Sequence, residues 1–265
     1  MQKSIQAHYE AHSGTSYESA YFYSPGNYID NLVKRVTERL GLGNEHRRIL
    51  DVGGGTGNFT KMLVENNKVD AVVIDPFLES SSGFVVDQLT FVKASAEDLG
   101  DQGKVWWRQN YQQVLMKEVI HHVKAKDRLS IFQGVFNDLK GVPPIKGPNI
   151  LIITRPDVMI DYPLWEAARE VWTANQPSFH EIEADLKAAG FARISCTTET
   201  YPCSIPLDRW QSMVRGRFWS TFSNFSDDEL NIACELIAKE ASSKIDEMSV
   251  IHFEDRLLFI SAYKV

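Results

Sequence analysis

Four glycines within five positions constrain this chain more than any other feature of its sequence. They lie in ILDVGGGTGNFTKML (49–63), directly behind an apolar run that ends in an aspartate and a valine. A turn between a strand and a helix needs fewer glycines, and each glycine costs conformational entropy on folding. The stretch therefore predicts a place where backbone N–H groups and a helix N-terminus lie close to a ligand.

Short apolar segments alternate with helical patterns on both sides of this turn. Apolar residues at helical spacing predict a helix over 28–43 that ends at Gly41 or Gly43. The pattern predicts strands at 47–52, 70–75, 89–95 and 149–154, a fourth strand that starts at 111 and becomes helical near Glu118, and helices at 58–67 and 127–140. Such continuous apolar strands are typical of a parallel sheet that helices cover on both faces.

The last third of the chain has a different pattern. Strands are expected at 191–201 and 250–265, with a mostly helical insert between them that contains Trp210, Trp219 and Phe222. We predict an α/β fold with a Rossmann-like, seven-stranded, mostly parallel sheet, helices on both faces, an antiparallel last strand and the insert between strands 6 and 7. No linker divides the sequence, so we expect a single domain over 1–265 with an N-terminal segment (1–27), a ligand-binding core (28–155) and the insert (202–249).

Composition narrows the class of function. The chain has 265 residues, of which 43% are apolar, and its net charge of -7 disfavours nucleic acid as a partner. The three cysteines form no C-x-x-C motif, which predicts no metal site and a reducing compartment. No apolar run reaches the ~18 residues that span a membrane, and the first residues lack the apolar region of a signal peptide. We therefore expect a cytoplasmic protein, monomeric or homodimeric, without a membrane or nucleic-acid partner.

The spacing of the glycines separates two kinds of ligand. Enzymes that bind a dinucleotide pyrophosphate carry G-x-G-x-x-G/A, and this chain has Asn58 where the third small residue is required. The glycines instead follow D-x-G-x-G-x-G from Asp51 to Gly57. This spacing favours a ligand that lays an amino-acid part and a ribose over the turn, and it disfavours a nicotinamide-dependent oxidoreductase.

Three motifs together resemble one family. The D-x-G-x-G-x-G stretch is followed by Asp75 at the end of the second strand, by KASAEDL (93–99) and by LMKEVIHHV (115–123). Over about 28–155 this series resembles the class I S-adenosylmethionine-dependent methyltransferases, especially the small-molecule branch that includes the ubiquinone/menaquinone and trans-aconitate methyltransferases. The resemblance implies S-adenosylmethionine as cofactor and a small-molecule methyl acceptor, most often modified at oxygen or nitrogen.

The resemblance also assigns roles around the cofactor. Asp51 would face the amino group of its methionine part, and Asp75 would accept both ribose hydroxyls. Phe77 would lie against the adenine, and Ser95 stands where relatives often carry an acidic residue for the adenine amino group. The full set of implied cofactor residues is Asp51, Gly53, Gly55, Thr56, Gly57, Asn58, Asp75, Pro76, Phe77, Ser95, Ala96, Glu97, Lys117 and Glu118.

Candidates for catalysis and substrate binding are less specific. His121 and His122 follow the fourth strand, where a histidine can take a proton from an acceptor hydroxyl or amine, although the same pair can serve only to pack the start of a helix. Arg155 follows the fifth strand and is a candidate anchor for a carboxylate. The N-terminal aromatic residues, above all Tyr9, Tyr17, Tyr21 and Tyr23, either form a lid over the acceptor or belong to a loosely ordered tail.

Two other functions stay open. A methyltransferase that acts on a macromolecule is disfavoured by the acidic composition and by the residues MKEV near the fourth strand, where base-modifying relatives carry N/D-P-P-Y/F. The non-enzymatic alternative is an inactive cofactor-binding module or partner subunit of a methyltransferase. Ser95 favours that alternative slightly, while the glycine turn and Asp75 favour an active enzyme.

Overall fold

The computed structural model describes residues 26–43, 45–78, 84–86, 88–101, 106–108, 111–139, 143 and 145–264. The chain forms two compact units. One comprises 29–156, 177–199 and 257–265 and is called the sheet unit here; the other includes 157–176 and 200–256 and is called the aromatic unit. The expected organisation as a single domain with an insert stays a prediction.

A mixed sheet carries the fold, in the order β3-β4-β2-β1-β5-β6-β8-β7. Its strands are β1 (Arg47–Val52), β2 (Val69–Ile74), β3 (Phe84–Val86), β4 (Leu89–Val92), β5 (Gln113–Lys117), β6 (Ile150–Thr154), β7 (Ala192–Pro206) and β8 (Val250–Tyr263). The pairs β4–β2, β2–β1, β1–β5 and β5–β6 are parallel, and β8 is antiparallel to β6. The predicted seven strands and the antiparallel last strand are confirmed, and β3 is a short eighth strand, antiparallel to β4, that the sequence analysis missed.

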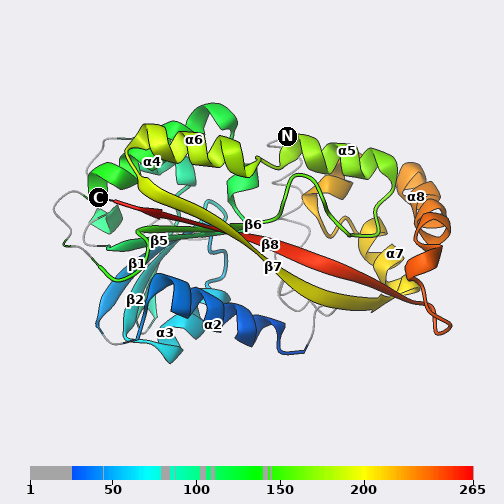
Figure 1. Ribbon diagram of the computed structural model, residues 1–265, viewed down its shortest axis with the longest axis horizontal. Helices are drawn as coiled ribbons and strands as arrows, with labels where there is room; N and C mark the ends of the chain where they lie inside the picture. The colour runs from blue at the N-terminus through cyan, green and yellow to red at the C-terminus, as the bar shows by residue number, and fades with distance from the viewer. Residues whose placement is uncertain are drawn as a thin grey trace. The chain divides into compact units, whose positions relative to one another are not determined.

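Helices cover both faces of the sheet unit, as predicted. Figure 1 shows α2 (Tyr28–Leu40) and α3 (Asn58–Asn66) on one face, and α4 (Ala125–Asp138) and α6 (Phe179–Ala189) on the other. Phe132, Leu186 and Ile152 are buried together between the sheet and this second pair of helices. Because both faces are covered, the central strands are apolar almost throughout. Gly41, with φ 67°, follows the last residue of α2, where the sequence predicted the helix to end.

The parallel strands end at one edge of the sheet. In the register of the sheet, Val52 pairs with Ile74 and with Met116, and Ile74 pairs with Val92. The loops that follow β1, β2, β4 and β5 therefore leave the sheet side by side, at the edge where open α/β folds bind ligands. The third predicted strand, expected over 89–95, is shorter and ends at Val92, because the chain turns there into a short 3-10 helix, η2 (Ala96–Leu99).

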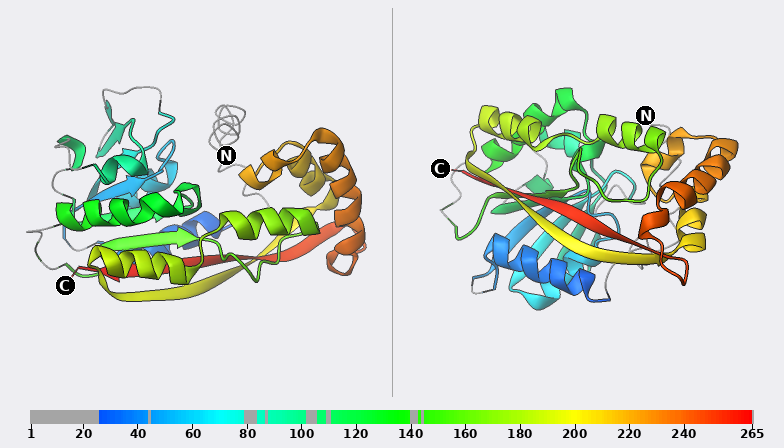
Figure 2. Two further views of the ribbon diagram at one scale, coloured as in Figure 1. Left: turned by 90° about the horizontal axis from the view of Figure 1, so that it is seen from above. Right: turned by 45° about the vertical axis from the view of Figure 1, so that its right-hand side comes forward.

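The aromatic unit contains the predicted insert. Its elements are α5 (Glu166–Asn175), α7 (Leu207–Arg215), η5 (Ser220–Asn224), α8 (Asp227–Glu240), η6 (Ser242–Lys244) and parts of β7 and β8. Figure 2 shows α7 and α8, coloured from yellow to orange, in the connection between β7 and β8. The sequence pattern predicts no element over 156–190, so α5 and α6 are additions to the predicted fold.

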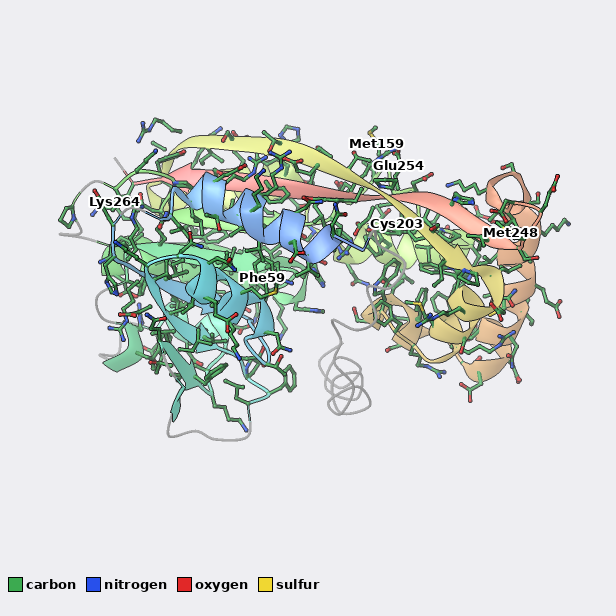
Figure 3. The ribbon with its side chains drawn as sticks, turned by 90° about the horizontal axis from the view of Figure 1, so that it is seen from below. Phe59, Met159, Cys203, Met248, Glu254 and Lys264 are labelled. Atoms are coloured by element: carbon green, nitrogen blue, oxygen red, sulfur yellow. The ribbon has the colours of Figure 1, made fainter. Side chains whose placement is uncertain are left out.

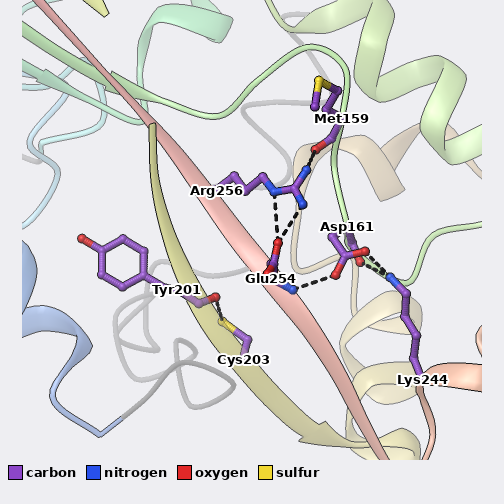
Figure 4. A network of polar contacts seen from close by, with 7 residues as sticks. All are labelled: Met159, Asp161, Tyr201, Cys203, Lys244, Glu254 and Arg256. Carbon is purple, nitrogen blue, oxygen red and sulfur yellow. Dashed lines mark hydrogen bonds and ion pairs between the residues drawn. The ribbon is translucent and has the colours of Figure 1, made fainter. Parts of the chain in front are cut away.

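Tryptophan side chains form the core of the aromatic unit. Trp210 and Trp219 are buried with their ring centroids 5.5 Å apart, and Trp210 Nε1 donates a hydrogen bond to the Pro163 carbonyl at 2.9 Å. Polar contacts tie the surface of this unit together (Figure 4): Asp161 accepts hydrogen bonds from Lys244 and from the Glu254 backbone N–H. Trp210 and Trp219, both from the insert, thus lie in the core of the aromatic unit, and the Asp161 contacts lie at its surface.

Candidate active site

The glycine turn adopts a backbone conformation that only glycine enters without strain. Gly53, Gly55 and Gly57 follow β1 with φ values of 72°, 54° and 75°. Residues with side chains rarely adopt such positive φ values. Gly57 is also the N-cap of α3, so the turn leads directly to a helix N-terminus.

Contacts with neighbouring side chains exclude a side chain at two of these glycines, whereas the third lies beside open space. A Cβ on Gly53 would lie 2.5 Å from Cγ2 of Val119, and one on Gly57 would lie 2.5 Å from Cε1 of Phe91. A Cβ on Gly55 would meet no atom of the described residues within 4 Å. Gly53 and Gly57 are thus required by packing, whereas Gly55 faces a space that a side chain would fill. This open backbone fits a ligand that lies directly against the turn.

Asp75 lies beside Gly55. Its carboxylate accepts the Gly55 N–H at 3.0 Å and the Phe77 N–H at 2.9 Å, one on each oxygen. A carboxylate has about four acceptor positions, so each oxygen keeps one for a ligand hydroxyl. Burial raises the pKa of Asp75, while the two backbone hydrogen bonds lower it. The Phe77 side chain is 39% exposed next to this carboxylate, and the arrangement fits a ribose with a flat base beside it.

The side chain of Asp51 packs against the backbone of the glycine turn. Its carboxylate is buried and accepts a hydrogen bond from the Thr60 hydroxyl on α3. A Cβ on Gly54 would overlap its Oδ2 atom, so the carboxylate fills the space under the turn. Burial raises the pKa of Asp51 to about 6, against the opposing effects of the Thr60 hydrogen bond and the Lys117 charge. Thr60 was missed by the sequence analysis.

The segment after β4 is held by its own cap. The Ser95 hydroxyl and backbone N–H both donate to Asp98 Oδ2, at 3.2 and 2.7 Å, at the start of η2. Ala96 is buried and Glu97 is exposed. The Ser95 hydroxyl, predicted to contact an adenine, is thus used in capping η2. Thr56, Asn58 and Pro76, which the resemblance also assigns to the cofactor, have exposed side chains.

A buried ion pair follows β5. Glu118 has a φ of 58°, and its Oε2 atom accepts from the Arg155 guanidinium, which lies directly after β6. Its Oε1 atom is enclosed and has no hydrogen-bond partner among the described residues. Arg155, predicted to hold an acceptor carboxylate, therefore already holds a carboxylate of its own chain. Lys117 Nζ lies 5.1 Å from the ring centroid of Phe59, on α3 (Figure 3).

The two candidate catalytic histidines lie in the 3-10 helix η4 (Ile120–His122), with ring centroids 4.0 Å apart. Burial lowers the pKa of His121 well below its usual value and that of His122 to about 4. Both rings are neutral at pH 7, and His122 is a weak base because effective general bases have pKa values near the working pH. His121 Nδ1 is enclosed and has no hydrogen-bond partner among the described residues.

Other predicted features can be placed only in part. Tyr9, Tyr17, Tyr21 and Tyr23 lie outside the described residues. In the part of the chain that the structure describes, no cluster of three or more histidine, cysteine or acidic side chains is arranged to hold a metal ion. No helix within the described ranges has the length and apolar character required to cross a membrane. Cys196, Cys203 and Cys234 form no disulfide within the described ranges.

Comparisons with known proteins agree with this geometry. Residues 26–141 match the family model of a methyltransferase domain, and no curated protein matches the sequence. A putative methyltransferase from an antibiotic biosynthesis pathway of Anabaena variabilis is 15% identical; the superposition covers 91% of this chain and 99% of that one, with a TM-score of 0.61. A cyclopropane synthase from Mycobacterium tuberculosis is 15% identical, with coverages of 88% and 83% and a TM-score of 0.51.

A third similar structure is phosphoethanolamine N-methyltransferase 2 of Haemonchus contortus, in complex with phosphomonomethylethanolamine and S-adenosylhomocysteine. It is 16% identical, with a TM-score of 0.52, and the superposition covers 92% of this chain and 55% of that one, so this chain spans about half its length. The family model supports the predicted methyltransferase resemblance over residues 26–141, while the specific small-molecule branch stays a prediction. Residues 26–141 of the chain therefore resemble a methyltransferase domain, and the chain shares its fold with solved methyltransferase structures.

Proposed function

We propose that this chain transfers a methyl group from S-adenosylmethionine to an oxygen or nitrogen atom of a small-molecule acceptor. The observation that carries the proposal is the open backbone of Gly55 beside the Asp75 carboxylate, which is 2% exposed and accepts one backbone N–H on each oxygen. When bound, S-adenosylmethionine supplies an electrophilic methyl group on a positively charged sulfur. The glycine turn and Asp75 would hold it at the edge of the sheet.

The protein's own contribution is mainly orientation and exclusion of water. Holding two reactants in line can lower a barrier by about 7–11 kcal/mol, and a carboxylate acceptor needs no base. A phenol, alcohol or amine must lose a proton, and the neutral ring of His121 has a nitrogen that can take it. Burial lowers the pKa of His121 well below its usual value and that of His122 to about 4, so both are weak bases at neutral pH.

The size of the acceptor is inferred from charge and from similar proteins. The net charge of -7 disfavours nucleic acid, and the similar protein from Haemonchus contortus is bound to a small phosphorylated amine.

We further propose a cytoplasmic location and a monomeric or homodimeric state. The N-terminal tyrosines are proposed to contribute to the acceptor site, so deletion of 1–24 should abolish turnover and preserve S-adenosylhomocysteine binding.

Two observations favour the alternative of a cofactor-binding module without turnover. Burial of His121 and His122 weakens both as bases, and the Ser95 hydroxyl is used in a helix cap. To separate the two functions, the protein should be incubated with S-adenosylmethionine and a panel of small amines, phenols and carboxylic acids, with release of S-adenosylhomocysteine as the signal. Acceptor-dependent release supports the enzyme. Tight binding without release across the panel favours the module.

A further inference from the structure

We propose that Thr60 is a positioning residue for the cofactor site: its hydroxyl holds the Asp51 carboxylate in its charged form beneath the glycine turn. The inference rests on the proposed function, because it concerns the same turn. It adds a residue outside the D-x-G-x-G-x-G motif, and it predicts that this pair contributes to the pH dependence of the affinity for the cofactor.

The geometry places the hydroxyl where it joins the two elements that flank the turn. Asp51 lies near the end of β1, and Thr60 lies in the first turn of α3, nine residues later. Thr60 is 1% exposed and Asp51 is 3% exposed, so their hydrogen bond is shielded from solvent. Asp51 also fills the space that a Cβ on Gly54 would need. The hydrogen bond from Thr60 therefore holds the carboxylate that packs against the turn.

Three elements surround the Asp51 carboxylate. Lys117 on β5 favours its charged form, Asp75 after β2 disfavours it, and α3 presents the uncharged hydroxyl of Thr60. Burial raises the pKa of Asp51 to about 6, and the Thr60 hydrogen bond is the largest of the effects that lower it. The carboxylate is therefore half protonated near pH 6, and loss of the Thr60 hydrogen bond would raise the pH at which this occurs.

The charge of Asp51 matters to a ligand that carries an ammonium group, as S-adenosylmethionine and S-adenosylhomocysteine both do. A charged acceptor near the turn favours such a ligand, and a protonated one does not. Affinity should therefore decrease as the pH falls through the pKa of Asp51. Thr60 sets the pH at which this happens.

The test compares Thr60→Val, which keeps the shape and removes the hydroxyl, with Thr60→Ser, which keeps the hydroxyl. The Kd of S-adenosylhomocysteine is measured by titration calorimetry between pH 5 and pH 9 for these two variants and the wild type. We expect the midpoint of the pH dependence to rise by about one pH unit in Thr60→Val, because a hydrogen bond to a charged group has about that effect. Binding at pH 6 would weaken about fivefold, binding at pH 9 would match the wild type, and Thr60→Ser would restore the midpoint.

A second readout needs no ligand. The carboxyl carbon of Asp51 is followed by NMR during a pH titration of the wild type and both variants, and we expect its pKa to rise in Thr60→Val only. An unchanged midpoint in Thr60→Val, or an equal loss of affinity at every pH, would show a purely structural role and overturn the inference. If the wild type binds no S-adenosylhomocysteine at any pH, the proposed function fails, while the NMR titration still decides the link between Thr60 and Asp51.

Discussion

A methyl group on Gly53 would lie 2.5 Å from Cγ2 of Val119, so the glycine turn packs directly on the segment that follows β5. At Gly55, two residues later, no atom in the described part of the chain lies within 4 Å of the same hypothetical position. Both residues have a positive φ, yet the protein's own packing excludes a side chain at Gly53, and an open space remains at Gly55. The two glycines therefore have separate roles within one turn.

Alanine substitutions should separate these roles. Gly53→Ala combines backbone strain of about 1–2 kcal/mol with overpacking of about 1–3 kcal/mol, so we expect a loss of about 3 kcal/mol in the free energy of unfolding. Gly55→Ala carries the strain alone and should lose about 1–2 kcal/mol, while it weakens binding of S-adenosylhomocysteine at least tenfold. Urea denaturation and calorimetry measure both quantities. Equal losses of stability in the two variants would contradict the packing argument.

Asp75→Asn should weaken cofactor binding, and it also removes one of the two hydrogen bonds from the Gly55 and Phe77 backbone N–H groups. The substitution removes the charge and turns one acceptor oxygen into a donor, so we expect binding of S-adenosylhomocysteine to weaken about 10- to 100-fold. Asp70→Asn, on β2 and partly exposed beside His46, is the control and should bind normally. If calorimetry gives the same affinity for both variants, Asp75 does not bind the ribose.

Asp51 should make the folded protein less stable as the pH rises. Its pKa is about 6 in the folded state and 3.8 in the unfolded state, so the folded chain holds more protons between these pH values. Stability then falls with rising pH across this window, by up to about 3 kcal/mol for this group. Relative to the wild type, Asp51→Asn should gain stability between pH 4 and pH 6 and keep that gain above it. Thermal unfolding of both proteins across pH 3–8 measures the difference; a difference that does not change with pH would mean that the pKa of Asp51 is not raised.

The Glu118–Arg155 pair should be costly to break on one side. Arg155→Met leaves a charged carboxylate without its guanidinium and should lower the free energy of unfolding by about 3–5 kcal/mol. Adding Glu118→Gln removes the unpaired charge and should recover a good part of that loss. The double-mutant cycle is measured by chemical denaturation. Additive effects of the two substitutions would show that the pair is not coupled.

The sequence predicts the sheet well because its signals are local. The apolar runs of β1, β2, β5 and β6 are buried on both faces, and periodicity finds such strands directly. The helix α6 was missed although Ser178 and Glu181 form a capping box at its start and Gly190 ends it. These signals can be read from sequence. β3 has only three residues, too few for any periodicity.

The site is predictable to the extent that its residues are close in sequence. The glycines and Asp75 follow consecutive strands, so the parallel sheet alone brings them to one edge. The link between Thr60 and Asp51 depends on how α3 packs under the turn, and the contact of Arg155 with Glu118 depends on the register of β6 beside β5. Residue patterns do not specify such contacts between elements, so the structure was needed to find them.

The central claim is that the glycine turn and Asp75 bind S-adenosylmethionine. The most direct measurement is isothermal titration of the purified protein with S-adenosylmethionine, S-adenosylhomocysteine and NADH under identical conditions. We predict micromolar binding of the first two and no binding of NADH. Binding of NADH alone, or of none of the three, would contradict the claim.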